Sequence, residues 1–127
     1  MDILFVDAGV LFSAAYRPQA GLQRFWKLTQ ARLVTSAYAV EEARRNLAEE
    51  SQRETLARLL RSMEVIPSTA AGRLPQGVDL PEKDVPILLA AIHARATHLI
   101  TGDKRHFGRY FGRRIAGVLI LPPADYF

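Results

Sequence analysis

The chain has 127 residues, of which 49 % are hydrophobic and 24 % are charged. This composition is typical of a folded globular protein, so a disordered chain is not expected. Lys and Arg number 17 and Asp and Glu number 13, giving a net charge of +4. That charge favours polyanionic partners without by itself indicating nucleic-acid binding. We expect one domain over residues 1–127.

The sequence argues against cysteine-based sites, a signal peptide and a membrane-spanning helix. The sequence has no cysteine, which excludes a disulfide framework and a Cys-ligated zinc or iron–sulfur site. The apolar start, MDILFVDAGVLF, carries Asp2 and Asp7 and lacks a basic beginning, so it is a poor signal peptide. No apolar run approaches the roughly 20 residues that a membrane-spanning helix needs. We therefore expect a cytoplasmic protein with no membrane partner.

The first half of the chain alternates predicted strands and helices. Residues 3–6 form a continuous apolar run, which is typical of a buried parallel strand. Residues 21–32 have apolar side chains at nearly helical spacing, and residues 33–35 predict a second strand. Ser36 is a good N-cap for a helix that continues to about residue 47.

The second half repeats this alternation. Residues 54–63 predict a helix, and residues 65–67 predict a possible third strand. Residues 68–83 contain several Pro and Gly, which predicts a loop within the domain. The next helix is predicted by apolar residues at i, i+3, i+4 and i+7, namely Val85, Leu88, Leu89 and Ile92. Residues 99–101 and 117–121 predict the last strands.

This order favours an α/β fold with a central, mostly parallel sheet of about four to five strands flanked by helices. In such Rossmann-like folds, ligands gather at the carboxyl ends of the strands, near the topological switch point. Asp7 and Asp103 each directly follow a predicted strand. We therefore expect both carboxylates to face the same crevice.

Four acidic residues are candidates for a site in that crevice: Asp7, Glu42, Asp84 and Asp103. Carboxylates that share a cleft repel one another, so several of them stay ionised only beside a cation. Mg²⁺ binds to a few carboxylates plus water, and it can activate water for attack on a phosphodiester. Taken singly, each acid has a structural explanation as a turn, a solvated helix face or a helix N-terminus. The helical pattern alone does not choose between Glu41 and Glu42.

Together the acids resemble a known pattern. The segments FVDAGVLFSA, VTSAYAVEEARRNL, EKDVPILLAAIHARATHLITGDKRHFG and GVLILPPADY resemble, in this order, the successive blocks of a PIN domain. The third is the strongest match, because an Asp opens an apolar helix that leads to a strand and then to Thr-Gly-Asp. PIN domains are metal-dependent nucleases that act mostly on RNA, and many are VapC-like toxins of toxin–antitoxin pairs. The resemblance implies a Mg²⁺- or Mn²⁺-dependent endoribonuclease with an antitoxin partner, and we also expect a homodimer.

The resemblance assigns roles residue by residue. Asp7, Asp84 and Asp103 match the family's metal-binding acids and would hold one or two metal ions. Glu42 matches the helical glutamate and would complete the site or orient a water, with Glu41 as the fallback. Thr101 would support Asp103 by a hydroxyl hydrogen bond, although a β-branched strand residue is an equally good explanation of it.

A basic segment adjoins the last acid. Residues 104–114 contain five cationic side chains and no acid, and cations of this kind bind phosphates without reading sequence. Phe107 and Phe111 are spaced i, i+4, and we expect both in the core rather than stacked on bases. The expected RNA contacts are Lys104, Arg105, His106 and Arg109.

Two departures from the family pattern keep a second hypothesis open. Gly9 stands where the family usually has Asn, Ser or Thr, and His106 and Phe107 stand where some relatives carry a further acid. The alternative is an inactive PIN-like module that binds RNA or a protein without cutting. A phosphotransfer domain ranks low, because DAGV offers no second acid two residues after Asp7.

Overall fold

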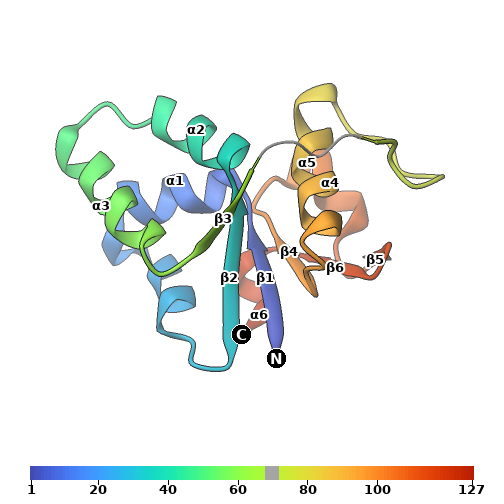
Figure 1. Cartoon of the computed structure of the whole chain (residues 1–127), viewed down its shortest axis with the longest axis horizontal. Helices are drawn as coiled ribbons and strands as arrows, with labels where there is room; N and C mark the ends of the chain where they lie inside the picture. Colours follow the sequence, from blue (N-terminus) through green and yellow to red (C-terminus); the bar gives the residue numbers. More distant parts are fainter. Residues whose placement is uncertain (68–71) are drawn as a thin grey trace.

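The computed structural model describes residues 1–67 and 72–127, and these build a six-stranded sheet with order β3-β2-β1-β4-β6-β5 (Figure 1). All neighbouring strands are parallel except β5 and β6. The strands are β1 (Asp2–Val6), β2 (Ala31–Ser36), β3 (Glu64–Ile66), β4 (His98–Ile100), β5 (Arg114–Ile115) and β6 (Val118–Leu121).

Helices cover the sheet. The α-helices are α1 (Ala8–Tyr16), α2 (Ala37–Arg45), α3 (Glu50–Leu60), α4 (Val85–His93), α5 (Lys104–Phe107) and α6 (Pro123–Tyr126). The 3₁₀ helices are η1 (Pro18–Ala20), η2 (Leu22–Lys27), η3 (Glu82–Asp84) and η4 (Gly108–Tyr110). α1 packs on α2 and α3, while α4 packs against β2 and β4 (Figure 1). Within the described ranges, no helix is both long and apolar enough to cross a membrane.

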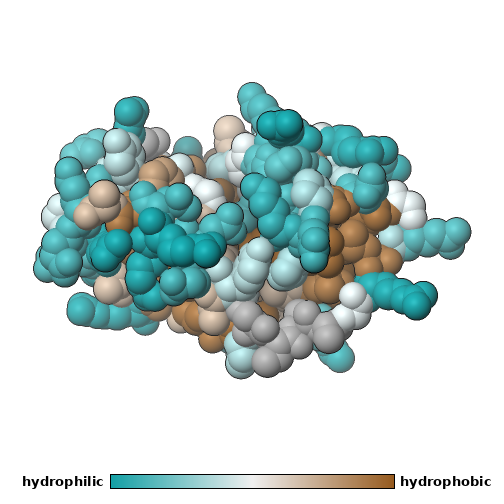
Figure 2. Space-filling model, turned by 90° about the horizontal axis from the view of Figure 1, so that it is seen from above, coloured by the Kyte–Doolittle hydropathy of each residue, from teal (hydrophilic) through white to brown (hydrophobic). Residues whose placement is uncertain are grey.

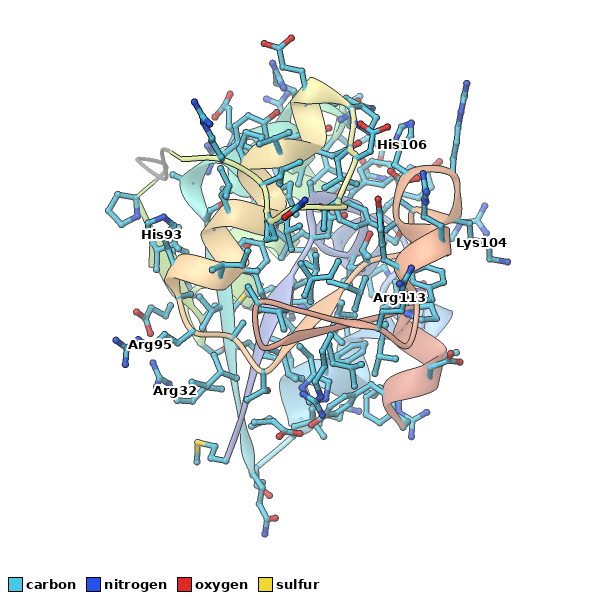
Figure 3. All side chains as sticks on the ribbon, turned by 90° about the vertical axis from the view of Figure 1, so that its right-hand side faces the viewer. Arg32, His93, Arg95, Lys104, His106 and Arg113 are labelled. Carbon is cyan, nitrogen blue, oxygen red and sulfur yellow. The ribbon has the colours of Figure 1, made fainter. Side chains whose placement is uncertain are left out.

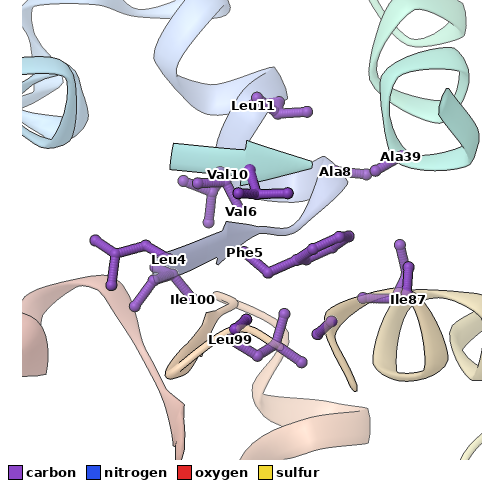
Figure 4. Packing of buried hydrophobic residues seen from close by; sticks show 14 of the residues in the cluster. Leu4, Phe5, Val6, Ala8, Val10, Leu11, Ala39, Ile87, Leu99 and Ile100 are labelled. Atoms are coloured by element: carbon purple, nitrogen blue, oxygen red, sulfur yellow. The ribbon is translucent and has the colours of Figure 1, made fainter. Parts of the chain in front are cut away.

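The core is centred on β1, whose residues Leu4, Phe5 and Val6 are completely buried. Phe5 points toward Ile87 of α4, and Val10 and Leu11 of α1 lie on the other side of the strand (Figure 4). Because both faces of the strand are covered, every position after Ile3 is apolar rather than alternately polar. The buried apolar run ends at Val6, and Asp7 follows the strand directly.

The chain reverses its direction of travel across the sheet at β1. From β1 it moves to β2 and β3 on one side, then crosses to β4 and β6 on the other. The ladder continues to the edge of the sheet, since the N–H of Asp7 donates to Ile100 and the N–H of Thr101 donates to Leu121, both at 3.0 Å. The carboxyl ends of β1 and β4 therefore lie side by side at the topological switch point.

The predicted fold class is confirmed, with six strands where about four to five were expected and with several local differences. β5 has two residues and pairs antiparallel with β6, so it is too short to leave a periodic pattern in the sequence. α1 is not predicted, because its residues are apolar almost throughout and lack a helical stripe. In the segment 21–32 the structure has the 3₁₀ helix η2 and then the start of β2. Of the predicted loop 68–83, residues 68–71 lie outside the described residues, and its last two belong to η3.

Candidate active site

A cavity of about 390 Å³ opens at the carboxyl edge of the sheet. Figure 2 views the molecule from this end, and hydrophilic residues cover most of the surface there. Four separate segments contribute acids to the cavity: the end of β1, the middle of α2, the residue before α4 and the residues after β4. The acids among its lining residues are Asp7, Glu42, Asp84 and Asp103.

Asp7 begins α1 and is buried. Its Oδ1 accepts a hydrogen bond from the N–H of Ala8 at 2.6 Å, and its Oδ2 accepts one from the Thr101 hydroxyl at 2.7 Å. Burial raises the pKa of Asp7 to about 6, the two hydrogen bonds oppose this, and the carboxylates of Asp84 and Glu42 raise it further. The site thus holds this carboxylate in a place that disfavours its charge unless a cation is near.

Thr101 links two of the acids. Its hydroxyl donates to Asp7 and accepts from the backbone N–H of Asp103 at 3.2 Å. The side chain is completely buried, so water does not compete for these bonds. The sequence suggested a hydroxyl bond that supports Asp103; in the structure the hydroxyl accepts from the backbone N–H of Asp103 and donates to the carboxylate of Asp7. One hydroxyl therefore fixes the ends of β1 and β4 relative to each other.

Asp84 ends η3 and precedes α4, but its side chain does not cap the helix. The residue is 9 % exposed, and its Oδ2 is buried without a hydrogen bond. Burial raises the pKa of Asp84, the nearby His106 lowers it and the Asp103 carboxylate raises it. The N-cap role that its sequence position suggested is therefore not what the Asp84 carboxylate does in the structure.

His106 lies between two acids. Its Nδ1 is 2.8 Å from Asp103 Oδ2 and 2.9 Å from Asp84 Oδ2. Only the pair with Asp103 has hydrogen-bond geometry, because one N–H cannot be aimed at both oxygens. Asp103 Oδ1 also accepts the backbone N–H of His106 at 3.1 Å, which holds the two residues together.

The two neighbouring glutamates of α2 differ in position. Glu42 lines the cavity and acts on the pKa of Asp7 and of Asp84. Glu41 is exposed and pairs with Arg44 on the helix surface at 3.2 Å. Of the two, the structure brings Glu42 to the other acids.

Cationic side chains follow the last acid of the cavity along the chain. Lys104, Arg105 and Arg109 are exposed on and after α5, next to Asp103. In Figure 3, His106 is at the upper end of the molecule with Lys104 on its outer side, whereas His93 and Arg95 are on the opposite side of the view.

The aromatic residues of this segment face inward. Phe107 is completely buried, and Phe111 is partly buried against the core, so the core prediction for both is confirmed. Tyr110 is buried too, and its hydroxyl accepts from the N–H of Asp79 and donates to its carbonyl oxygen. The aromatic rings therefore anchor the basic segment.

Of the other lining residues, Gly9 was already marked by its departure from the family pattern, whereas Phe12 and Lys83 carried no signal in the sequence. Gly9, Phe12 and Lys83 line the cavity, and Gly9 and Phe12 also line an adjacent cavity of about 280 Å³. A Cβ on Gly9 would meet nothing within 4 Å, so the absent side chain leaves open space. The contact of His106 with Asp103 had a signal in the i, i+3 spacing, whereas its approach to Asp84 had none.

The residues present fit a divalent cation. Carboxylate oxygens are the ligands that Mg²⁺ and Mn²⁺ favour. A buried carboxylate oxygen without a hydrogen bond, as in Asp84, is costly unless a cation or proton satisfies it. Carboxylates of Asp84 and Asp103 and a nitrogen of His106 offer ligand atoms within 4.8 Å of one another.

Fold and site together define an α/β domain with an acidic cavity at the topological switch point of its sheet. No family model matches the sequence, and no curated protein matches it. Among solved structures, a chain of VapBC2 from Rickettsia felis, in a crystal structure with a DNA fragment from its promoter, matches with a TM-score of 0.71. The match covers 94 % of this chain and 98 % of that one at 17 % identity. A likeness at this identity shows the fold alone.

Proposed function

We propose that this chain is a metal-dependent endoribonuclease that hydrolyses RNA phosphodiester bonds in the acidic cavity. The observation that carries the proposal is the convergence of four acids from four segments on one cavity, with a buried carboxylate oxygen of Asp84 left without a hydrogen bond. A structural role explains single acids, but it does not explain four of them around one opening.

The residues at the cavity would have different roles in the reaction. Bound Mg²⁺ or Mn²⁺ would supply an activated water and neutralise charge at the phosphorus. Asp7, Asp84 and Asp103 would provide the oxygens that hold it, and Thr101 keeps two of them in register. Glu42 would orient the attacking water from the α2 side of the cavity. Lys104, Arg105, Arg109 and the Nε2 side of His106 would bind phosphates of the RNA.

The partner proposal rests on the structural likeness and the sequence resemblance. The likeness is to VapBC2, a protein crystallised with DNA from its own promoter. We extend to this chain the proposal of a toxin role with a cognate antitoxin, together with a homodimer and a cytoplasmic location. A small overlapping upstream gene for a DNA-binding protein, whose product binds this chain when the two are co-expressed, would support the toxin role.

The second candidate is a PIN-like module that holds RNA or protein without cutting. Gly9 favours it, since the cavity lacks the polar group that the family usually has at this position. In that case the acids would bind a cation that serves only to hold RNA.

A cleavage assay with matched variants tests the proposal. In Mn²⁺ or Mg²⁺ the chain should cut RNA oligonucleotides, and EDTA should stop it. Asp7→Asn, Asp103→Asn and Glu42→Gln should each lower the rate by about 10²-fold or more, since each removes a group from the metal or its water. Glu41→Gln is the control, because Glu41 sits on the same helix and faces away from the cavity. Cleavage that survives in Asp103→Asn would reject the assignment.

A further inference from the structure

We propose that His106 is itself a metal ligand, so that Asp84, Asp103 and His106 form a site that binds Mn²⁺ in preference to Mg²⁺. This inference rests on the proposed function and deepens it, since Asp84 and Asp103 line the same cavity and His106 contacts both. It also gives His106 a different role from the RNA contact expected from the sequence.

The spacing of the three ligand atoms fits one coordination sphere. His106 Nδ1 is 2.8 Å from Asp103 Oδ2 and 2.9 Å from Asp84 Oδ2. In an octahedral site with ligands at about 2.1 Å, adjacent ligand atoms are about 3 Å apart. The nitrogen therefore already stands at the distance from both oxygens that a shared ion would set.

The hydrogen-bond pattern leaves one buried carboxylate oxygen that a cation would satisfy. Nδ1 is within hydrogen-bond distance of Asp103 Oδ2, and the buried Oδ2 of Asp84 has no hydrogen-bond partner. An ion between the three atoms would contact both carboxylates at once. A ring protonated on both nitrogens would release its Nδ1 proton to solvent on binding, whereas a neutral ring would bind as the tautomer that carries its proton on Nε2.

His106 is held in this position by its neighbours. Its backbone N–H donates to Asp103 Oδ1, and the next residue, Phe107, is completely buried. These contacts hold the backbone at His106 without using a ring nitrogen. A ligand fixed by such outer contacts loses little freedom when it binds an ion.

The nitrogen ligand from His106 would determine the preference for Mn²⁺ over Mg²⁺. Mg²⁺ is a hard cation that favours oxygen ligands and keeps its waters, whereas imidazole suits first-row transition metals. The remaining acids, Asp7 and Glu42, offer only oxygen. His106 is therefore the residue that would separate Mn²⁺ from Mg²⁺ in this cavity.

The test measures metal binding by the full chain without RNA. Electron paramagnetic resonance of Mn²⁺ counts bound ion, and its electron spin-echo modulation detects a directly bonded nitrogen. Calorimetry gives the Mg²⁺ affinity. The variant is His106→Gln, and the matched control is His93→Gln, at the exposed end of α4.

We expect the wild type to bind Mn²⁺ at least tenfold more tightly than Mg²⁺, with a nitrogen coupling. His106→Gln should lose the coupling and weaken Mn²⁺ binding by about 10- to 100-fold, while Mg²⁺ binding changes less than threefold. His93→Gln should match the wild type. If His106→Gln does not fold, ¹⁵N-histidine labelling of the wild type still reports the Mn–N bond.

Three results would overturn the inference: no Mn²⁺ binding, bound Mn²⁺ without nitrogen coupling, or equal loss of both metals in His106→Gln. These outcomes are separate from those of the cleavage assay. A chain that cuts RNA but shows no nitrogen coupling keeps the proposed function and loses this inference. A chain that binds Mn²⁺ through His106 but never cuts RNA does the reverse.

Discussion

A carboxylate that is buried without a permanent counter-ion makes the free energy of unfolding depend on pH, and Asp7 is such a group. Burial is the largest influence on it, and the hydrogen bonds from Thr101 and Ala8 offset only part of the effect. The cost of holding this charge is relieved when a cation binds. The residue is therefore placed for ligand binding at the expense of stability in the metal-free protein.

The pH dependence of stability follows from that pKa. Asp7 has a pKa near 3.8 when unfolded and about 6 when folded, so the folded state binds more protons between these values. The free energy of unfolding should therefore fall as pH rises from about 4 to about 6, by about 3 kcal/mol from this residue. Urea unfolding in EDTA at several pH values, compared with Asp7→Asn, isolates the contribution. A variant with the same pH slope as the wild type would contradict the assignment.

Removing the Thr101 hydroxyl should weaken the protein and disturb both acids. Thr101→Val leaves a buried oxygen of Asp7 and the N–H of Asp103 without partners, which costs about 1–3 kcal/mol for such a group. Thermal or urea unfolding measures the loss. Thr55→Val is the control, since the Thr55 hydroxyl only returns to a carbonyl of its own exposed helix. Equal losses in the two variants would show that the link between β1 and β4 is unimportant.

At the scale of elements, the sequence predicts those with a clear local signal. Ser36 was predicted to cap a helix, and it accepts the N–H of Ala39 at 3.2 Å. The spacing of apolar residues likewise predicted α4. α1 escaped prediction because it is apolar on nearly every side, and β5 because two residues carry no period.

The residues of the site likewise differ in whether the sequence carries a local signal for their position. The sequence could suggest that Asp7 and Asp103 share an edge, because each follows an apolar run at a strand end. It could not predict that His106 stands beside Asp84, since the two are 22 positions apart and meet only through the packing of α5 beside η3. Contacts of this kind depend on tertiary structure and leave no local pattern.

Gly9, the second residue of α1, offers a test at this scale. It is exposed, and a Cβ there meets nothing within 4 Å. Gly9→Ala should stabilise the protein by about 0.5–1 kcal/mol through helix propensity alone. Gly9→Ser should in addition place a hydroxyl at the cavity and raise Mn²⁺ affinity several-fold, measured by calorimetry. If alanine raises the affinity as much as serine, a polar group at this position is not what the cavity lacks.

At the scale of the whole molecule, sheet order creates the site. β1 lies between β2 and β4, so the chain leaves the central strand in both directions and the carboxyl ends of two neighbours converge. α2 and the segment before α4 add Glu42 and Asp84 to this edge, and exposed cations follow β4 along the chain. A net positive chain thus carries its buried acids in one cavity. This arrangement suits an anionic substrate that approaches a cation.

The chemistry of the cleaved ends tests the central claim most directly. RNA with a single 2′-deoxy residue 5′ to the scissile bond should still be cut in Mn²⁺, because water and not the 2′-hydroxyl attacks the phosphorus. The products should carry no 2′,3′-cyclic phosphate. Neither product should form in EDTA or with the Asp103→Asn variant. RNA that stays bound and intact at every Mn²⁺ and Mg²⁺ concentration would contradict the account and identify a binding module.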